Sequence, residues 1–129
     1  MRIRNHNGFT LVELMVTVAI LGVVASIAIP AYNGYIKTSH KSECNNEMAA
    51  IKLAESEFFL DNNAYFKGDN VGDLTTNSGN IYSPSSAAAG ANSECDYSVA
   101  ITTTTFTITA TPTTTGHLNG EAAWTLSGP

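Results

Sequence analysis

The sequence predicts an α+β fold, in which one long N-terminal helix packs on a small antiparallel sheet of three or four strands. Two patterns in the 129-residue chain support this fold class. The first is a run without charged side chains over residues 14–36, followed by apolar residues at helical spacing as far as residue 60. The second is an alternation of apolar and polar residues in three segments after residue 95, which is typical of half-buried strands.

The uncharged run is long enough to cross a bilayer as a helix, because about 20 apolar residues suffice. Glu13 lies at its start. An ionisable side chain at this depth is costly, so we expect a functional role and a partner for it; the alternative is an acid at the headgroup level of a simple membrane protein. Pro30 removes a helix hydrogen bond within the run, which predicts either a kink with local unwinding or a tolerated transmembrane proline.

Residues 1–8 are short, positive and polar, and we expect them to be a cleaved leader peptide. In an ordinary secretory signal the cleavage site follows the apolar core. Here the candidate site, between Gly8 and Phe9, precedes the core, so cleavage would leave the membrane segment on the mature protein. Arg2 and Arg4 stay cytoplasmic by the positive-inside rule, which puts the C-terminal part outside the inner membrane.

Several features of this region occur together. They are the leader ending in Gly8, the sequence Phe9-Thr-Leu-Val-Glu13-Leu-Met15, Pro30, and the pair Tyr32 and Tyr35. Together they resemble the precursor of a type IV pilin, and the same pattern marks the pseudopilins of type II secretion. The resemblance covers roughly the first third of the chain.

The resemblance implies a role for four residues. An aspartic prepilin peptidase would cut after Gly8, and the new amine of Phe9 would be methylated. In a helical filament of identical subunits, Glu13 would neutralise the N-terminus of a neighbour, and the stretch around Pro30 would loosen on packing. An inner-membrane assembly platform would be a further partner.

The pairing of Glu13 with an N-terminus also has a physical reason. A carboxylate and an ammonium group in hydrocarbon are each penalised alone, and less so together. Phe9 and Glu13 are four residues apart, which is about 6 Å of helix rise. A neighbour shifted axially by that distance would bring the two charges together.

Residues 37–60 predict the amphipathic half of the helix, after a transmembrane or filament-core half over residues 9–36. An apolar stripe interrupted by one acid consists of Cys44, Met48, Ile51, Ala54, Glu55 and Phe58. The polar face carries Lys41, Glu43, Glu47, Lys52, Glu57 and Asp61. We expect the stripe to pack on the sheet; binding to a membrane surface is the weaker alternative, because the polar face is not basic.

Residues 61–129 are expected to form a globular head. Residues 61–94 are rich in Asn, Gly, Ser and Asp and predict a loop region. Asp69 and Asp73 suggest calcium, but their spacing matches no twelve-residue calcium loop. Residues 95–127 predict the antiparallel sheet, with one face toward the helix and a Thr-rich face outward; a glycosylated surface is the alternative for the Thr tract. The apolar positions are Tyr97, Val99, Ile101, Phe106, Ile108, Ala110, Ala122, Trp124 and Leu126.

Two cysteines, Cys44 and Cys95, fit an oxidising compartment. A disulfide between them would tie the helix to the start of the sheet and stabilise the fold by about 4 kcal/mol in the chain-entropy model; a pair of free thiols is the alternative. In the pilins that the chain resembles, both cysteines lie near the C-terminus. The C-terminal receptor-binding loop of that family is therefore not carried over to this chain.

No catalytic, cofactor or metal site is predicted. His6 lies in the leader, His40 and His117 are isolated, and no Ser/His/Asp, Cys/His or paired-carboxylate constellation is visible in the sequence. We interpret His40 as a surface residue just past the membrane. The formal net charge of −5 and the lack of a basic cluster argue against a direct nucleic-acid site.

The sequence therefore predicts a structural subunit of a type IV pilus, in the inner membrane before assembly and in an extracellular filament afterwards. Within the family, the alternatives are a minor pilin or a secretion pseudopilin. A third reading is an electron-conducting subunit, suggested by aromatic residues along the helix and its exit: Phe9, Tyr32, Tyr35, Phe58, Phe59 and Tyr65. The last alternative is a monomeric, membrane-anchored binding module. Roles in adhesion, twitching motility or DNA uptake depend on motors and partner subunits encoded elsewhere.

Overall fold

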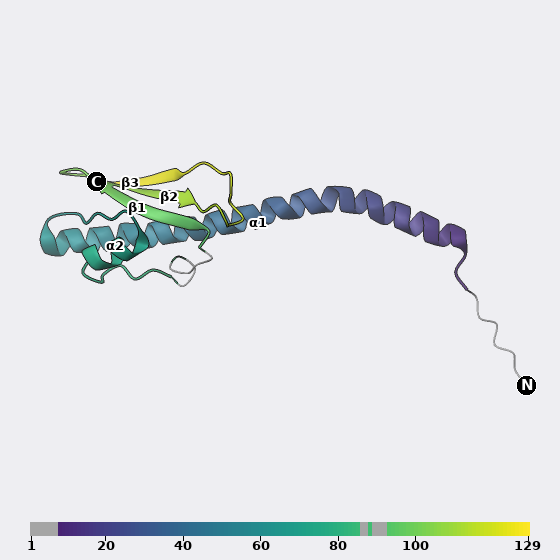
Figure 1. Cartoon of the computed structure of the whole chain (residues 1–129), viewed down its shortest axis with the longest axis horizontal. Helices are drawn as coiled ribbons and strands as arrows, with labels where there is room; N and C mark the ends of the chain where they lie inside the picture. Colours follow the sequence, from purple (N-terminus) through teal and green to yellow (C-terminus); the bar gives the residue numbers. More distant parts are fainter. Residues whose placement is uncertain (1–7, 86–87, 89–92) are drawn as a thin grey trace, which may run out of the picture. The chain divides into compact units, whose positions relative to one another are not determined.

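The computed structural model describes residues 8–85, 88 and 93–129. Its elements are α1 (Leu11–Asn62), α2 (Val71–Asn77), β1 (Cys95–Ile101), β2 (Phe106–Pro112) and β3 (Trp124–Gly128), drawn in Figure 1. The fold is thus α+β, as predicted. The chain divides into two compact units, residues 1–35 and 36–129, which are described separately below. Most of the expected leader, residues 1–7, and part of the expected loop, residues 86–87 and 89–92, lie outside the described residues.

The first unit contains the beginning of α1. In the described part of the chain, α1 is the one helix that is long and apolar enough to cross a membrane, judged by length and composition. Pro30 lies inside α1 without ending it. Loosening of this stretch during filament packing stays a prediction.

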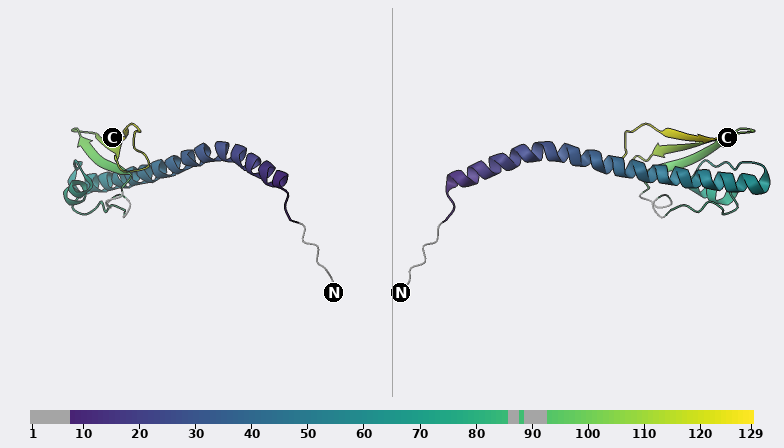
Figure 2. Two further views of the ribbon diagram at one scale, coloured as in Figure 1. Left: turned by 45° about the vertical axis from the view of Figure 1, so that its right-hand side comes forward. Right: turned by 180° about the vertical axis from the view of Figure 1, so that it is seen from behind.

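The second unit packs the rest of α1 against the sheet. The strands are antiparallel in the order β1-β2-β3, and Val99, Ile108 and Leu126 lie opposite one another across the three strands. Figures 1 and 2 both show the sheet along one side of this part of α1. The expected stripe supplies Cys44, Met48, Ile51 and Ala54 to the core. The sheet supplies Tyr97, Val99, Phe106, Ile108 and Ala110.

Three side chains depart from their predicted faces. One is Ala122, which is exposed and lies before β3 begins at Trp124. Ile101 is 39% exposed, although the alternation places it on the buried face. It is the last residue of β1, next to the turn in which the N–H of Thr102 donates to the carbonyl of Thr105. Glu47, expected on the polar face of the helix, is instead buried. The residues that cover Glu47 come from the segment between α1 and the sheet, which helical periodicity within α1 does not reveal.

The prediction of a loop over residues 61–94 is wrong in one part, because α2 forms there. Asn70 caps this helix: its side-chain oxygen accepts a hydrogen bond from the N–H of Asp73 at 2.9 Å. The side-chain amide of Asn70 also donates to the Asp73 carboxylate at 2.7 Å. Asp73, weighed above as a calcium ligand, thus takes part in a helix cap.

Backbone hydrogen bonds between Gly68 and Val99 hold the segment before α2 against β1 of the sheet. The N–H of Val99 donates to the carbonyl of Gly68 at 2.8 Å, and the N–H of Gly68 donates back at 3.3 Å. A Cβ added to Gly68 would lie 2.8 Å from the backbone nitrogen of Leu74. Glycine is therefore required where β1, α2 and this bridge meet.

Candidate functional site

The start of α1 is a reciprocal cap between Thr10 and Glu13. The Oε2 atom of Glu13 accepts hydrogen bonds from the backbone N–H of Thr10 at 2.9 Å and from its hydroxyl at 2.8 Å. The backbone N–H of Glu13 donates to the Thr10 hydroxyl oxygen at 3.2 Å. This is a capping box, whose signature in the sequence is Thr-x-x-Glu. Within a single chain, the carboxylate of Glu13 is thus already bonded to the first turn of its own helix.

Gly8 and Phe9 stand just before this cap. Both are exposed and precede the first helical residue, and the Phe9 side chain is 92% exposed. The peptide bond between them is therefore not protected by helix hydrogen bonds.

The apolar side chains of the first unit have no cover within the described chain. The exposed large residues include Leu11, Leu14, Met15, Ile20, Leu21, Val23, Ile27 and Ile29. An apolar surface that surrounds a whole helix is far larger than the patches on monomeric soluble proteins. Lipid or other protein must cover it.

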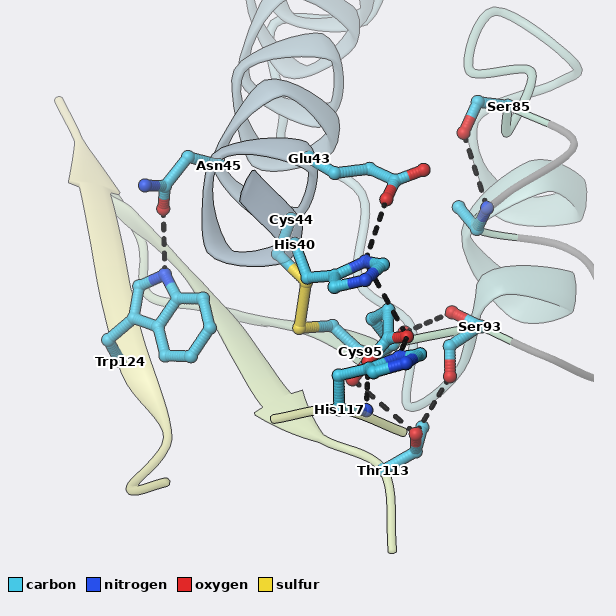
Figure 3. Close-up of a disulfide and its surroundings, with 12 residues drawn as sticks. His40, Glu43, Cys44, Asn45, Ser85, Ser93, Cys95, Thr113, His117 and Trp124 are labelled. Atoms are coloured by element: carbon cyan, nitrogen blue, oxygen red, sulfur yellow. Dashed lines mark hydrogen bonds and ion pairs between the residues drawn. A yellow bond between two sulfur atoms is a disulfide. The ribbon is translucent and has the colours of Figure 1, made fainter. Parts of the chain in front are cut away.

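The second unit is tied together by a disulfide between Cys44 of α1 and Cys95 of β1. Both cysteines are 1% exposed. The far edge of the sheet is held separately, since the indole N–H of Trp124 donates to the side-chain oxygen of Asn45 at 2.8 Å. The Lys41 ammonium lies 4.8 Å from the centroid of the same indole, a cation–π distance. Figure 3 shows the disulfide and the Trp124–Asn45 contact on the same stretch of α1.

The interpretation of His40 and His117 as isolated residues is wrong. Their rings stack with centroids 4.4 Å apart, as Figure 3 shows beside the disulfide. Glu94 joins them: its Oε1 lies 2.7 Å from Nδ1 of His117 and 3.5 Å from Nδ1 of His40. The two histidines are 77 positions apart in the sequence, so only the path of the chain brings them together.

Glu94 is the centre of this cluster. Its other oxygen, Oε2, accepts a hydrogen bond from the backbone N–H of His117 at 2.6 Å. Burial alone would raise the pKa of Glu94, but the hydrogen bonds from the side chain and backbone of His117, with the charges of His40 and His117, lower it below 4.5. The carboxyl is therefore ionised near neutral pH.

Two other carboxyl groups are buried in the second unit. The Oε1 of Glu47 accepts a hydrogen bond from the Tyr82 hydroxyl at 2.6 Å. The Oε2 of Glu55 accepts one from the backbone N–H of Phe66 at 3.2 Å, while its Oε1 has no partner among the described residues. Burial raises the pKa of Glu55 to about 7 despite the opposing effect of the Phe66 bond. These groups are enclosed by the core, so neither is positioned to act on a bound molecule.

The aromatic residues considered for electron transfer fall into separate settings. Tyr32 and Tyr35 are exposed. Tyr65 stacks on Phe59 with centroids 4.7 Å apart and lies 5.0 Å from Phe106. These last contacts belong to the core of the second unit, where aromatic packing is a stabilising feature.

Two family models match the chain. One, described as "Prokaryotic N-terminal methylation motif", matches residues 3–29. The other, described as "Type IV minor pilin ComP, DNA uptake sequence receptor", matches residues 30–121. With its long apolar helix, capped at Glu13, and its small antiparallel sheet, the chain belongs to the type IV pilin family. The methylation motif implies processing by a prepilin peptidase.

Curated relatives are also pilins or fimbrial proteins. The chain is 46% identical over 56 residues to the fimbrial protein EcpC of Eikenella corrodens, covering 43% of this chain and 37% of that protein. It is 38% identical over 86 residues to the type IV major pilin protein PilA of Myxococcus xanthus, covering 66% and 39%. For the type IV major fimbrial protein FimA of Dichelobacter nodosus the identity is 44% over 64 residues, covering 50% and 40%. The chain thus spans about two-fifths of the length of these relatives.

Proposed function

We propose that this protein is a structural subunit of a type IV pilus and has no catalytic activity. Residues 9–36 anchor it in the inner membrane before assembly, with the C-terminal part outside, and pack against other copies in the filament afterwards. The observation that carries this proposal is the uncovered apolar surface around the first part of α1. A bilayer and a filament core are the two environments that would cover such a surface in turn.

The residues at the helix start take specific roles in this proposal. Cleavage between Gly8 and Phe9 releases the amine of Phe9, which is then methylated. Glu13 pairs with that amine on a neighbouring subunit, giving up or sharing its own cap with Thr10. The helix loosens around Pro30 as subunits pack, and an inner-membrane platform performs the assembly.

Antibody labelling of filaments from the native host tests the structural role. With an antibody raised against the second unit, gold particles are expected along the whole length of each filament. Label only at filament tips would contradict the structural role and indicate a minor pilin. Label confined to the cell envelope would indicate a pseudopilin or an anchored binding module.

A minor pilin that contacts DNA is a second candidate, favoured by the match of residues 30–121 to the family of ComP, a DNA uptake sequence receptor. The charge of this chain opposes it, because residues 36–129 carry four lysines and ten carboxyl side chains. Lys37 also lies 3.7 Å from Glu121 in an ion pair. Electrophoretic mobility-shift assays at physiological salt distinguish the structural subunit from the minor pilin that contacts DNA. Binding of duplex DNA by the processed chain would favour the second candidate, and its absence the first.

A further inference from the structure

We propose that His40, Glu94 and His117 bind one divalent transition-metal ion of the zinc class. Each residue offers one ligand atom, and the three atoms lie within 4.8 Å of one another. Two imidazole nitrogens and one carboxylate oxygen are a donor set that such ions prefer, whereas Ca²⁺ and Mg²⁺ take oxygen ligands. The proposal is independent of the role in pili proposed above.

The disulfide brings two of the three ligands together. His40 precedes Cys44 by four residues on α1, which puts both on one face of the helix. Glu94 immediately precedes Cys95. The bond between Cys44 and Cys95 therefore holds a helix residue and a residue at the start of β1 beside each other without any ion. A site fixed in advance loses less conformational entropy when the ion binds.

The third ligand is held by the loop that follows β2. The N–H of Thr113 donates to the carbonyl of Glu94 at 3.0 Å, and the backbone N–H of His117 donates to Glu94 Oε2. A Cβ added to Gly116 would collide with the same Oε2. The loop thus passes close beneath the Glu94 carboxylate, leaving Oε1 toward the two rings. Such hydrogen bonds to a ligating carboxylate orient it toward a metal.

A buried ring nitrogen of His40 that lacks a hydrogen-bond partner supports a metal ion at the same site. Its Nδ1 is buried and has no hydrogen-bond partner in the described part of the chain, although Glu94 Oε1 lies 3.5 Å away and Glu43 Oε2 3.6 Å away. Buried polar atoms are nearly always satisfied, so this nitrogen calls for an explanation. A divalent cation between the two carboxylates, with both imidazoles neutral, would satisfy it and balance the charge, and Glu43 would become a fourth ligand.

Binding requires one adjustment. The two rings are now nearly parallel, with 11° between their planes, so their nitrogen lone pairs do not converge on one point. The His117 side chain is 62% exposed and can turn, while the His40 and Glu94 side chains are 26% and 11% exposed and stay in place. The ion would then replace the Glu94–His117 hydrogen bond and clamp the loop to α1.

Titration of the processed full-length chain in detergent micelles, prepared without a histidine tag, tests the proposal. With Co²⁺ as a spectroscopic probe, we expect one ion per chain and visible absorption bands of tetrahedral coordination. Zn²⁺ should displace Co²⁺ and raise the melting temperature. The affinity should fall at least about tenfold in His117→Gln and in Glu94→Gln, since each loses a ligand.

Glu57→Gln is the matched control, because it removes a carboxylate that is exposed on the same helix away from the cluster. It should bind as the unchanged protein does. His117→Gln keeps the test decisive if Glu94→Gln fails to fold, since an exposed side chain contributes little to the core. Absence of Co²⁺ and Zn²⁺ binding at micromolar concentrations, or equal binding by His117→Gln, would overturn the proposal. Loss of binding in Glu57→Gln as well would also overturn it.

Discussion

The Tyr82 hydroxyl donates a hydrogen bond of 2.6 Å to Oε1 of Glu47, across 35 positions of sequence. Tyr82 is 2% exposed and Glu47 is 7% exposed, so the bond lies inside the second unit. The backbone N–H of Ser85 donates to the same oxygen at 3.3 Å. Burial first, and then the bond to Glu47, raises the pKa of Tyr82 above its ordinary value of 10.0. The tyrosine therefore stays a neutral donor to a carboxylate, an arrangement that ties the segment before the sheet to α1.

Replacing Tyr82 with phenylalanine should lower the free energy of unfolding by about 1.5–3 kcal/mol, the usual range for a hydrogen bond to a charged group. The Glu47 carboxylate would remain buried without its strongest donor. Denaturant unfolding of the processed chain, followed by the fluorescence of Trp124, the single tryptophan, measures the change. Tyr35→Phe is the control because Tyr35 is 75% exposed. Equal stability of the two variants would contradict the prediction.

The buried Glu55 should make stability fall as pH rises. Its pKa is about 7 in the folded chain, against 4.5 as the ordinary value. Between these values the folded chain holds a proton that the unfolded chain has lost, so the free energy of unfolding decreases from about pH 4.5 and levels off above about pH 7. Glu55→Gln should remove this slope and be more stable at pH 8 by up to about 3 kcal/mol.

The measurement is denaturant unfolding at several pH values between 4 and 8. Glu57→Gln is the control, since Glu57 is exposed on the same helix. Its curve should keep the slope of the unchanged protein. A slope that persists in Glu55→Gln would show that another group causes the pH dependence.

Helix and strand positions were predictable because their patterns are local. The stripe from Cys44 to Ala54 and the alternation around Ile108 are read directly from neighbouring residues, and both face the core. Glu47 and the pair of histidines were not predictable in this way. Tyr82 covers Glu47 from 35 positions away, and His117 reaches His40 only after the disulfide and the loop following β2 have placed Glu94 between them.

Short polar signals were the other source of error. The helix α2 is only seven residues long, and its cap, Asn70 with Asp73, stands in a segment whose composition favours a loop. The capping box at Thr10 and Glu13 was missed for a different reason. A functional role already accounted for the carboxylate of Glu13, so no structural role was sought for it. The Glu13 side chain can both cap its own helix and take a functional role. Neither the composition of the sequence nor its resemblance to a family distinguishes these two roles.

Removing the disulfide with Cys44→Ala and Cys95→Ala together should lower the free energy of unfolding by about 4 kcal/mol. The bond spans 51 positions, and without it the unfolded chain gains the freedom of that loop. The same denaturant experiment measures the loss. The unchanged protein, unfolded in the presence of a thiol reductant, should match the double variant. Unaltered stability in both would contradict the structural role of the bond.

The two roles of Glu13 can be separated by two substitutions. Glu13→Gln keeps the hydrogen bonds of the capping box, in which Gln also serves, but removes the charge. Thr10→Val removes the cap partner and keeps the charge. If Glu13 pairs with the amine of a neighbour, Glu13→Gln should reduce the yield of sheared filaments at least about tenfold, the effect of losing roughly 1.4 kcal/mol per contact. Thr10→Val should assemble nearly as the unchanged protein does.

The comparison of these variants is made on equal amounts of processed protein in the inner membrane, so that only assembly is scored. Filaments from Glu13→Gln at the normal yield would rule out the charge pairing. Loss of filaments in Thr10→Val alone would assign Glu13 to helix capping instead.

The intact mass of this protein in filaments sheared from the native host tests the central claim most directly. The account predicts a chain that begins at methylated Phe9 and is two hydrogens lighter than the reduced form, because Cys44 and Cys95 are joined. That single mass, found in filaments, would confirm processing, disulfide formation and surface assembly together. A chain that still begins at Met1, or a processed chain found only in the inner membrane and never in the filaments, would contradict the account.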